Sequence, residues 1–256
     1  IWVASCLLLP DQRHPPNCFS YVCDQADYDI APLPSPARRD IRRGLRCFQV
    51  RVCTWDELES QGYEAFRDTE MRHGYAPPGA EGIKEFVQSR RNWPTFEIWG
   101  AWDAGSLAAW SSVMRIDDWA VIHVCDSRTP ALKNCPNNAV LYELTRKLLV
   151  EEKRKYVSYG LSSCQVDTEQ AGLHRYKVRM GYSALPRHRV FVPHPFLRPL
   201  LRPRLSSWMW DRAARAVPKS SVFRKVAGMA RLISGRETAP LAWAQTPSAD
   251  EQDKEC

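Results

Sequence analysis

The residues best placed to do chemistry are Tyr176 and Lys177, adjacent positions within residues 171–180, a stretch whose pattern predicts a helix that ends at Gly181. Lys177 lies four residues beyond Leu173, so its side chain can leave the apolar stripe of the helix and reach a neighbouring cleft. An ammonium group there can stabilise an oxyanion that develops during a reaction. The structural alternative is a lysine whose stem covers the helix end while its charge stays in water.

Groups that transfer protons are expected at the end of a predicted strand, residues 119–125. His123 can accept a proton at neutral pH, and Asp126 can act as a base or hold a cationic amine. Asp167, in the polar loop 162–170, is a third candidate. The competing interpretation of His123 is a hydrogen-bonded histidine within an apolar strand.

An anion-binding site is predicted where a long helix opens at Pro136. The free backbone amides and the dipole of a helix N-terminus attract phosphate. Asn137, Asn138 and Lys133 are the candidate ligands there. The alternative for an asparagine at this place is a purely structural N-cap.

The nine cysteines have irregular spacing, and no paired histidines complete a zinc site, so we predict no metal. Cys125, Cys135 and Cys164 fall near the same predicted strand ends. They allow a thioester relay, but small buried packing residues in a reducing cytosol are the competing interpretation.

Turn, capping and periodicity signals predict the elements that position these residues. Predicted helices cover 37–43, 54–73, 81–91, 138–155, 171–180, 206–216 and 222–233, and predicted strands cover 1–10, 47–52, 96–102, 107–116, 119–125, 156–161, 182–185 and 189–192. The strands 96–102, 107–116 and 119–125 follow one another at hairpin spacing, which excludes a Rossmann sheet. They indicate an α/β (α+β) fold with a mixed, mostly antiparallel twisted sheet flanked by helices.

This order of elements resembles the GNAT fold, and three short motifs resemble its FemAB-like branch of N-acyltransferases. The motifs are the basic segment 39–43 (Arg-Asp-Ile-Arg-Arg), the turn 136–138 (Pro-Asn-Asn) and the run 172–181, which reads Gly-Leu-x-x-aromatic-Lys-x-x-x-Gly. The resemblance covers residues 37–192. FemAB-like proteins usually hold two such domains in tandem, whereas this chain has room for about one.

The resemblance implies an enzyme that transfers an acyl or aminoacyl group to an amine on a small molecule or a cell-envelope precursor. It places Tyr176 and Lys177 near the acyl carbonyl. The donor is expected to be a co-substrate, acyl-CoA or aminoacyl-tRNA, with no permanently bound cofactor. Residues 133–138 lack the glycine-rich loop of CoA-dependent relatives, which leaves aminoacyl-tRNA as the other donor.

The net charge of +7 favours anionic partners, and much of it lies in residues 38–51 and 198–236. tRNA and an acidic membrane surface are the candidate partners, and DNA is not expected. The alternative function is a non-catalytic GNAT-like module that binds RNA or an acidic membrane through residues 195–236. A solvated basic face would explain each run equally well.

We predict four regions: a segment 1–36 that resembles the end of a preceding domain, a GNAT-like domain 37–194, a basic helical extension 195–236 and a disordered tail 237–256. Residues 1–10 are apolar but too short to span a bilayer, so a cytoplasmic protein with peripheral membrane contact is expected.

Overall fold

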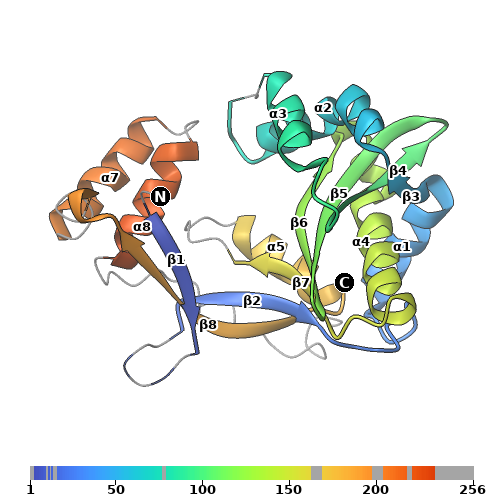
Figure 1. Cartoon of the computed structure of the whole chain (residues 1–256), viewed down its shortest axis with the longest axis horizontal. Coiled ribbons are helices and arrows are strands. Elements are labelled where there is room, and N and C mark those ends of the chain that lie inside the picture. The colour runs from blue at the N-terminus through green and yellow to red at the C-terminus, as the bar shows by residue number, and fades with distance from the viewer. Residues whose placement is uncertain are drawn as a thin grey trace. The chain divides into compact units, whose positions relative to one another are not determined.

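A computed structural model describes residues 3–9, 11, 13, 16–76, 79–162, 169–197, 204–217 and 221–233 (Figure 1). The chain forms two compact units. The larger unit holds Tyr21–Gly160 and Tyr176–Ala184, and the smaller unit holds Ile1–Ser20, Leu161–Arg175 and Leu185–Cys256. The predicted tail 237–256 lies outside the described residues.

The helices are α1 (Ser35–Cys47), α2 (Trp55–Arg72), α3 (Glu81–Arg90), α4 (Pro136–Arg146), α5 (Glu169–Arg179), α7 (Arg204–Ala216) and α8 (Ser221–Ile233), with the short turns η1 (Thr129–Asn134), η2 (Lys147–Glu151) and η3 (Pro195–Leu197). The strands are β1 (Val3–Leu8), β2 (Cys18–Cys23), β3 (Gln49–Cys53), β4 (Phe96–Asp103), β5 (Ser106–Ile116), β6 (Trp119–Ser127), β7 (Tyr156–Leu161) and β8 (Ser183–Pro193).

The sheet of the larger unit is mixed and mostly antiparallel. Its strand order is β2-β7-β6-β5-β4-β3; β3 to β6 pair antiparallel in succession, and β7 joins β6 in parallel. Helices α2 and α3 lie against one face, and α4 with α1 lies against the other (Figure 1). The predicted meander and the predicted GNAT-like fold class are confirmed.

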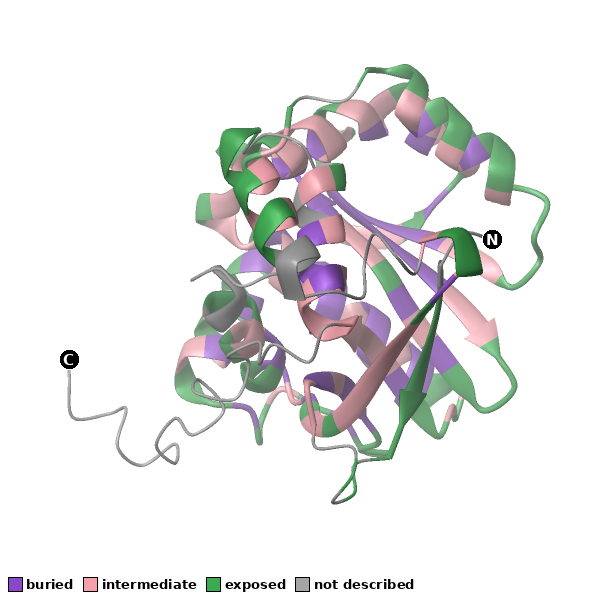
Figure 2. Cartoon of the chain, turned by 90° about the vertical axis from the view of Figure 1, so that its left-hand side faces the viewer, coloured by how far each residue is buried: buried purple, intermediate pink, exposed green. Residues whose placement is uncertain are grey.

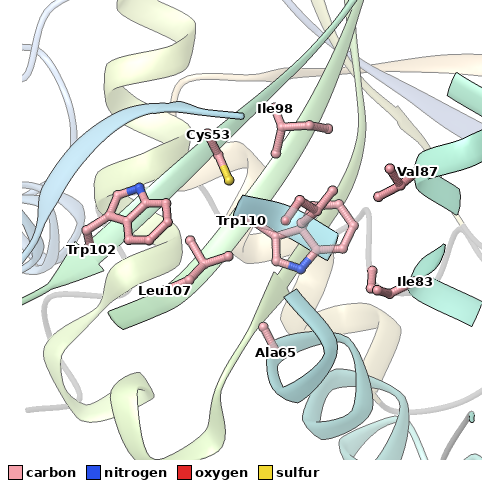
Figure 3. Packing of buried hydrophobic residues seen from close by; sticks show 9 residues of the cluster. Cys53, Ala65, Ile83, Val87, Ile98, Trp102, Leu107 and Trp110 are labelled. Carbon is pink, nitrogen blue, oxygen red and sulfur yellow. The ribbon is translucent and has the colours of Figure 1, made fainter. Parts of the chain in front are cut away.

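A hydrophobic core joins the sheet to α2 and α3. The ring of Trp110 on β5 lies between Ile83 and Val87 of α3 and Ala65 of α2, and all four side chains are buried (Figure 3). On the opposite face, α4 buries the stripe predicted from its period, namely Val140, Leu141, Leu144, and, in η2, Leu148 and Leu149. The sheet is therefore covered on both faces.

Local sequence signals predicted one end of each of two helices in the larger unit, correctly for α2 and wrongly for α1. The predicted capping box before α2 is confirmed: Glu57 N–H donates to Thr54 Oγ1, and Thr54 N–H donates to a Glu57 carboxylate oxygen. The predicted end of α1 at Gly44 is wrong. The helix continues through Gly44 to Cys47. The glycine serves packing instead of ending the helix, since a Cβ there would lie 2.6 Å from the carbonyl oxygen of Cys135 at the start of α4.

Three further boundaries differ from prediction. Helix α4 begins at Pro136, after a left-handed Cys135, and Lys153 with φ 58° has already left the helix before the predicted end at residue 155. Strand β2 was not predicted, because this buried strand gains its place in the sheet by pairing with strands far along the chain. The predicted strands 182–185 and 189–192 form one strand, β8.

The smaller unit pairs β1 antiparallel with β8, from Val3 opposite Pro193 to Leu8 opposite His188. Residues 4–9 are exposed, whereas most of β8 is half-buried (Figure 2). The predicted helices 206–216 and 222–233 are confirmed as α7 and α8, which pack against each other as a hairpin in this unit.

Candidate functional site

The parallel strands β6 and β7 separate part-way along their length. Their paired register covers only Trp119–Val121 opposite Tyr156–Ser158, although β6 continues to Ser127 and β7 to Leu161. Gly160, with φ 66°, then turns the end of β7 in a conformation that favours glycine. Beyond Val121 and Ser158, the backbone groups of β6 and β7 are therefore not hydrogen-bonded to each other, and the predicted catalytic residues lie beside this part of the strands.

Lys177 lies at the point where the strands separate. Its Nζ donates to the carbonyl oxygen of Tyr159, one residue beyond the last paired residue of β7, at 2.9 Å. The ammonium also lies 4.2 Å from the ring centroid of Tyr21 and 4.7 Å from that of Tyr159. The side chain is only 4% exposed, and desolvation lowers the pKa of Lys177 to about 8.

Tyr176 contributes a buried hydroxyl near the same strand ends. Among the described residues, this hydroxyl has no hydrogen-bond partner. Its pKa is raised well above the usual value by desolvation, with smaller contributions from nearby groups that include Cys125 and Cys135. Burial likewise raises the pKa of the Cys125 thiol to about 12, and this thiol shares a hydrogen bond with Tyr159. Such a thiol stays protonated at neutral pH, which disfavours a thioester relay through Cys125.

Asp126 is buried near the end of β6. Burial, with the negative charge of Glu70, raises its pKa to about 8 against the opposing effect of Arg72. Arg72 donates to Ser127, Thr129 and Thr69, and Asp126 Oδ2 has no hydrogen-bond partner in the described structure. The site therefore holds a neutral carboxyl group that a cation or a proton donor could satisfy.

His123 has a different environment. Its side chain is exposed, and it occupies the irregular position of β6 where the register with β5 shifts. Partial desolvation and the positive charge of Arg90 on α3 lower its pKa, so the imidazole is neutral at pH 7. It is thus not the buried core histidine of the competing interpretation, and it is available to accept a proton.

At the start of α4, where an anion site was predicted, the side chains of the two asparagines are used for hydrogen bonds within the protein. Asn137 and Asn138 are not N-caps: they are the second and third residues of α4, and their side-chain amides donate to Ser127 Oγ and Met180 Sδ. Lys133 is exposed, and its carbonyl oxygen accepts from Arg43 of α1. The backbone amides of the first turn, with the positive charge of Arg43, are what this end of α4 offers an anion.

Several site residues escaped the sequence analysis. Tyr21 and Tyr159 contact Lys177, while Thr69, Glu70 and Arg72 surround Asp126. The only local signal was a tyrosine-glycine pair at the end of the predicted strand 156–161. The candidates Asp167 and Cys164 lie outside the described residues.

Comparison with solved structures identifies the fold. One structure titled "Crystal structure of FemX" matches with a TM-score of 0.58 and 10% identity over 74% of this chain and 65% of that one. The chain has the fold of FemX. The C-terminal domain of a putative lysylphosphatidylglycerol synthetase from Agrobacterium fabrum matches with a TM-score of 0.51 and 10% identity, over 83% of this chain and 66% of that one. The resemblance to FemAB-like acyltransferases is thus confirmed for the fold.

This chain spans slightly less than two thirds of the length of either structure. No protein-family model matches the sequence, and no curated protein matches it either. Within the described part of the chain, no helix has both the length and the apolar character needed to cross a membrane. Nor do three or more metal-ligating side chains come together among those residues.

Proposed function

We propose that this chain catalyses transfer of an acyl or aminoacyl group from an activated donor to an amine. The observation that carries the proposal is the buried ammonium of Lys177, which lies where β6 and β7 separate. Its pKa is lowered by desolvation, and no acidic group among the described residues contributes to that shift. Attack of an amine on an acyl carbonyl forms a tetrahedral oxyanion, and a preorganised cation in a water-poor site stabilises that charge strongly.

Asp126 is the proposed base, and His123 the alternative. A carboxyl group with a pKa of about 8 is poised near the pH at which the enzyme would work, which suits a general base. An acceptor that arrives as an ammonium would favour ionisation of Asp126, which then takes the proton as the amine attacks. His123 is neutral and exposed, so it can serve an acceptor that approaches from solvent.

The proposal requires a movement at Lys177. Its ammonium is covered by two tyrosine rings and bonded to the carbonyl oxygen of Tyr159, so a substrate carbonyl must displace one of these contacts. The Tyr176 hydroxyl, buried without a partner in the described structure, is a second group that an acyl or leaving-group oxygen can engage.

We infer that the donor is held through its phosphates at the start of α4. Pro136 removes one backbone donor and no glycine-rich loop is present, so this end of α4 binds the pyrophosphate of CoA poorly. Arg39 and Arg43 of α1 contribute positive charge beside Cys135, which suits the longer anion of an aminoacyl-tRNA. A cell-envelope precursor or a small amine is the proposed acceptor class, in keeping with the FemAB-like fold.

The experiment is a transfer assay with two donors. The full chain is incubated with either acetyl-CoA or a mixed pool of aminoacyl-tRNA and with a panel of primary amines, and mass spectrometry detects acylated amines. We expect product with aminoacyl-tRNA and weak or no binding of acetyl-CoA by isothermal titration. Tight binding and turnover of acetyl-CoA would reverse the donor assignment, and absence of product with both donors would overturn the enzymatic proposal.

A further inference from the structure

The positive charge of the protein is concentrated in one segment. Residues 195–236 contain ten Lys or Arg residues and a single acidic residue, Asp211, which gives this segment a net charge of +9. Because the whole chain has a net charge of +7, the remaining residues together carry −2. The described part of the segment includes η3, α7 and α8, and α7 and α8 carry six of the ten basic residues together with Asp211.

One face of α7 combines arginine with exposed apolar side chains. Trp208, Arg212 and Arg215 follow at helical spacing and are exposed, and the Arg212 guanidinium lies 5.6 Å from the Trp208 ring centroid. Met209 beside them is 58% exposed. This face therefore has the composition of an amphipathic helix that lies in a lipid interface.

Two other residues of α7 pack within the hairpin. Trp210, on the side of α7 away from Trp208, meets Phe223 of α8 with ring centroids 6.2 Å apart. Asp211 lies three residues from Trp208 and four from Arg215, but its carboxylate accepts from Arg231 of α8 at 2.8 Å. The charge of the single acidic residue of the segment is thus paired with Arg231 of α8, and the Asp211 side chain is only 16% exposed. It therefore opposes an anionic surface less than an unpaired, exposed carboxylate would.

Further apolar side chains of the segment are exposed. Val217 and Val222, at the end of α7 and the start of α8, are 45% and 65% exposed, and Phe196 in η3, which precedes the hairpin in the sequence, is 81% exposed. Apolar side chains clustered with arginine mark a surface that binds something in the cell. Contact with a nucleic-acid phosphate buries little apolar surface of methionine or valine. Entry into the interface of a bilayer removes that surface from water, which is favourable in free energy.

We propose that the hairpin of α7 and α8 docks on an anionic lipid bilayer. Trp208 and Met209 enter the headgroup region, and Arg212 and Arg215 contact lipid phosphates. This inference does not depend on the proposed catalytic activity, because it rests on the smaller unit alone and is tested by binding.

The test is co-sedimentation of the full chain with vesicles of phosphatidylcholine alone or with phosphatidylglycerol added. We expect binding only to the anionic vesicles, weakening as salt is raised. Two variants, Arg212→Glu/Arg215→Glu and Trp208→Ser/Met209→Ser, should each weaken the partition constant by at least about tenfold. The matched control is Arg42→Glu/Arg46→Glu on α1, which makes the same charge change on exposed arginines and should bind as the wild type does.

Circular dichroism establishes that each variant is folded. Equal loss in the control and in the arginine variant would show that only net charge matters and would overturn the assignment to α7. Equal binding to neutral vesicles, or no binding to anionic ones, would also overturn it. If the chain instead retains a poly(U) oligonucleotide and no vesicles, the basic face serves RNA and the lipid proposal fails.

Discussion

At the scale of single residues, the site is defined by two ionisable groups whose pKa values burial moves toward each other. Lys177 loses affinity for its proton, and Asp126 gains it, so both titrate near pH 8. Buried groups shifted in this way are frequent in catalytic sites, although structural networks also contain them. Each shift has a consequence for stability that can be measured without any substrate.

Lys177→Met removes a charge whose burial is unfavourable below pH 8. Between about pH 8 and 10.5 the unfolded chain binds more protons than the folded chain, so the wild type gains stability as pH rises. We expect the stability of wild type relative to Lys177→Met to increase across this range, by up to about 3 kcal/mol. Urea unfolding of both proteins from pH 7 to 10 measures it, and a constant difference would contradict the buried ammonium.

Asp126→Asn should have the opposite dependence. Between about pH 4 and 8 the folded chain keeps a proton that the unfolded chain has lost, so wild-type stability falls as pH rises. Asp126→Asn has no carboxyl group to titrate, so its stability does not fall in this way. As pH rises, its free energy of unfolding relative to that of the wild type should therefore increase by at most about 1.4 kcal/mol for each pH unit. Thermal unfolding between pH 5 and 8 tests this, with the exposed Asp27→Asn as control. A control that follows the same trend would refute the assignment to Asp126.

At the scale of elements, close packing of α1 on α4 sets the geometry of the anion site. Gly44 lets the two helices approach each other closely, and Arg43 of the same turn donates a hydrogen bond to the carbonyl oxygen of Lys133. A larger residue at position 44 must push α1 away from the start of α4. The arginines of α1 would then move away from the proposed donor phosphates.

Gly44→Ala is therefore expected to destabilise the chain by about 1–3 kcal/mol, because its Cβ would lie 2.6 Å from the carbonyl oxygen of Cys135 and 2.8 Å from Ala139 Cβ. Gly172→Ala in α5 is the matched control: its Cβ meets no atom within 4 Å, so alanine there should be neutral or slightly stabilising. The midpoints of urea unfolding of the two variants and the wild type test this prediction. A midpoint of Gly44→Ala equal to that of Gly172→Ala would show that α1 adjusts without loss of stability.

At the scale of the whole molecule, the sequence predicted those parts of the fold that local signals determine. The capping box at Thr54, the hairpin turns of the meander and the period of α4 each placed an element correctly. Strand β2 escaped because it is identified by pairing with strands far along the chain. The domain boundaries proposed from composition remain a prediction.

The candidate site was predictable only in part, for a related reason. Tyr176 and Lys177 could be predicted because they are adjacent in the short motif 172–181. The two rings that cover Lys177 belong to Tyr21 and Tyr159, which lie far from each other in the sequence and could not be linked to Lys177 by spacing. The asparagines after Pro136 were predicted to bind an anion, with a structural N-cap as the alternative. The left-handed Cys135 occupies the cap instead, and both asparagine side chains form hydrogen bonds inside the unit. Long-range packing, rather than local propensity, decides these contacts.

The most direct measurement compares acyl-transfer rates of the wild type, Lys177→Met and Arg179→Met with the donor that gives product. Arg179→Met removes an exposed cation from the same helix and controls for general effects of charge. The account predicts that Lys177→Met, shown to be folded, loses at least about a hundredfold in rate, while Arg179→Met stays within about twofold of the wild type. A folded Lys177→Met variant that turns over as fast as the wild type would contradict it.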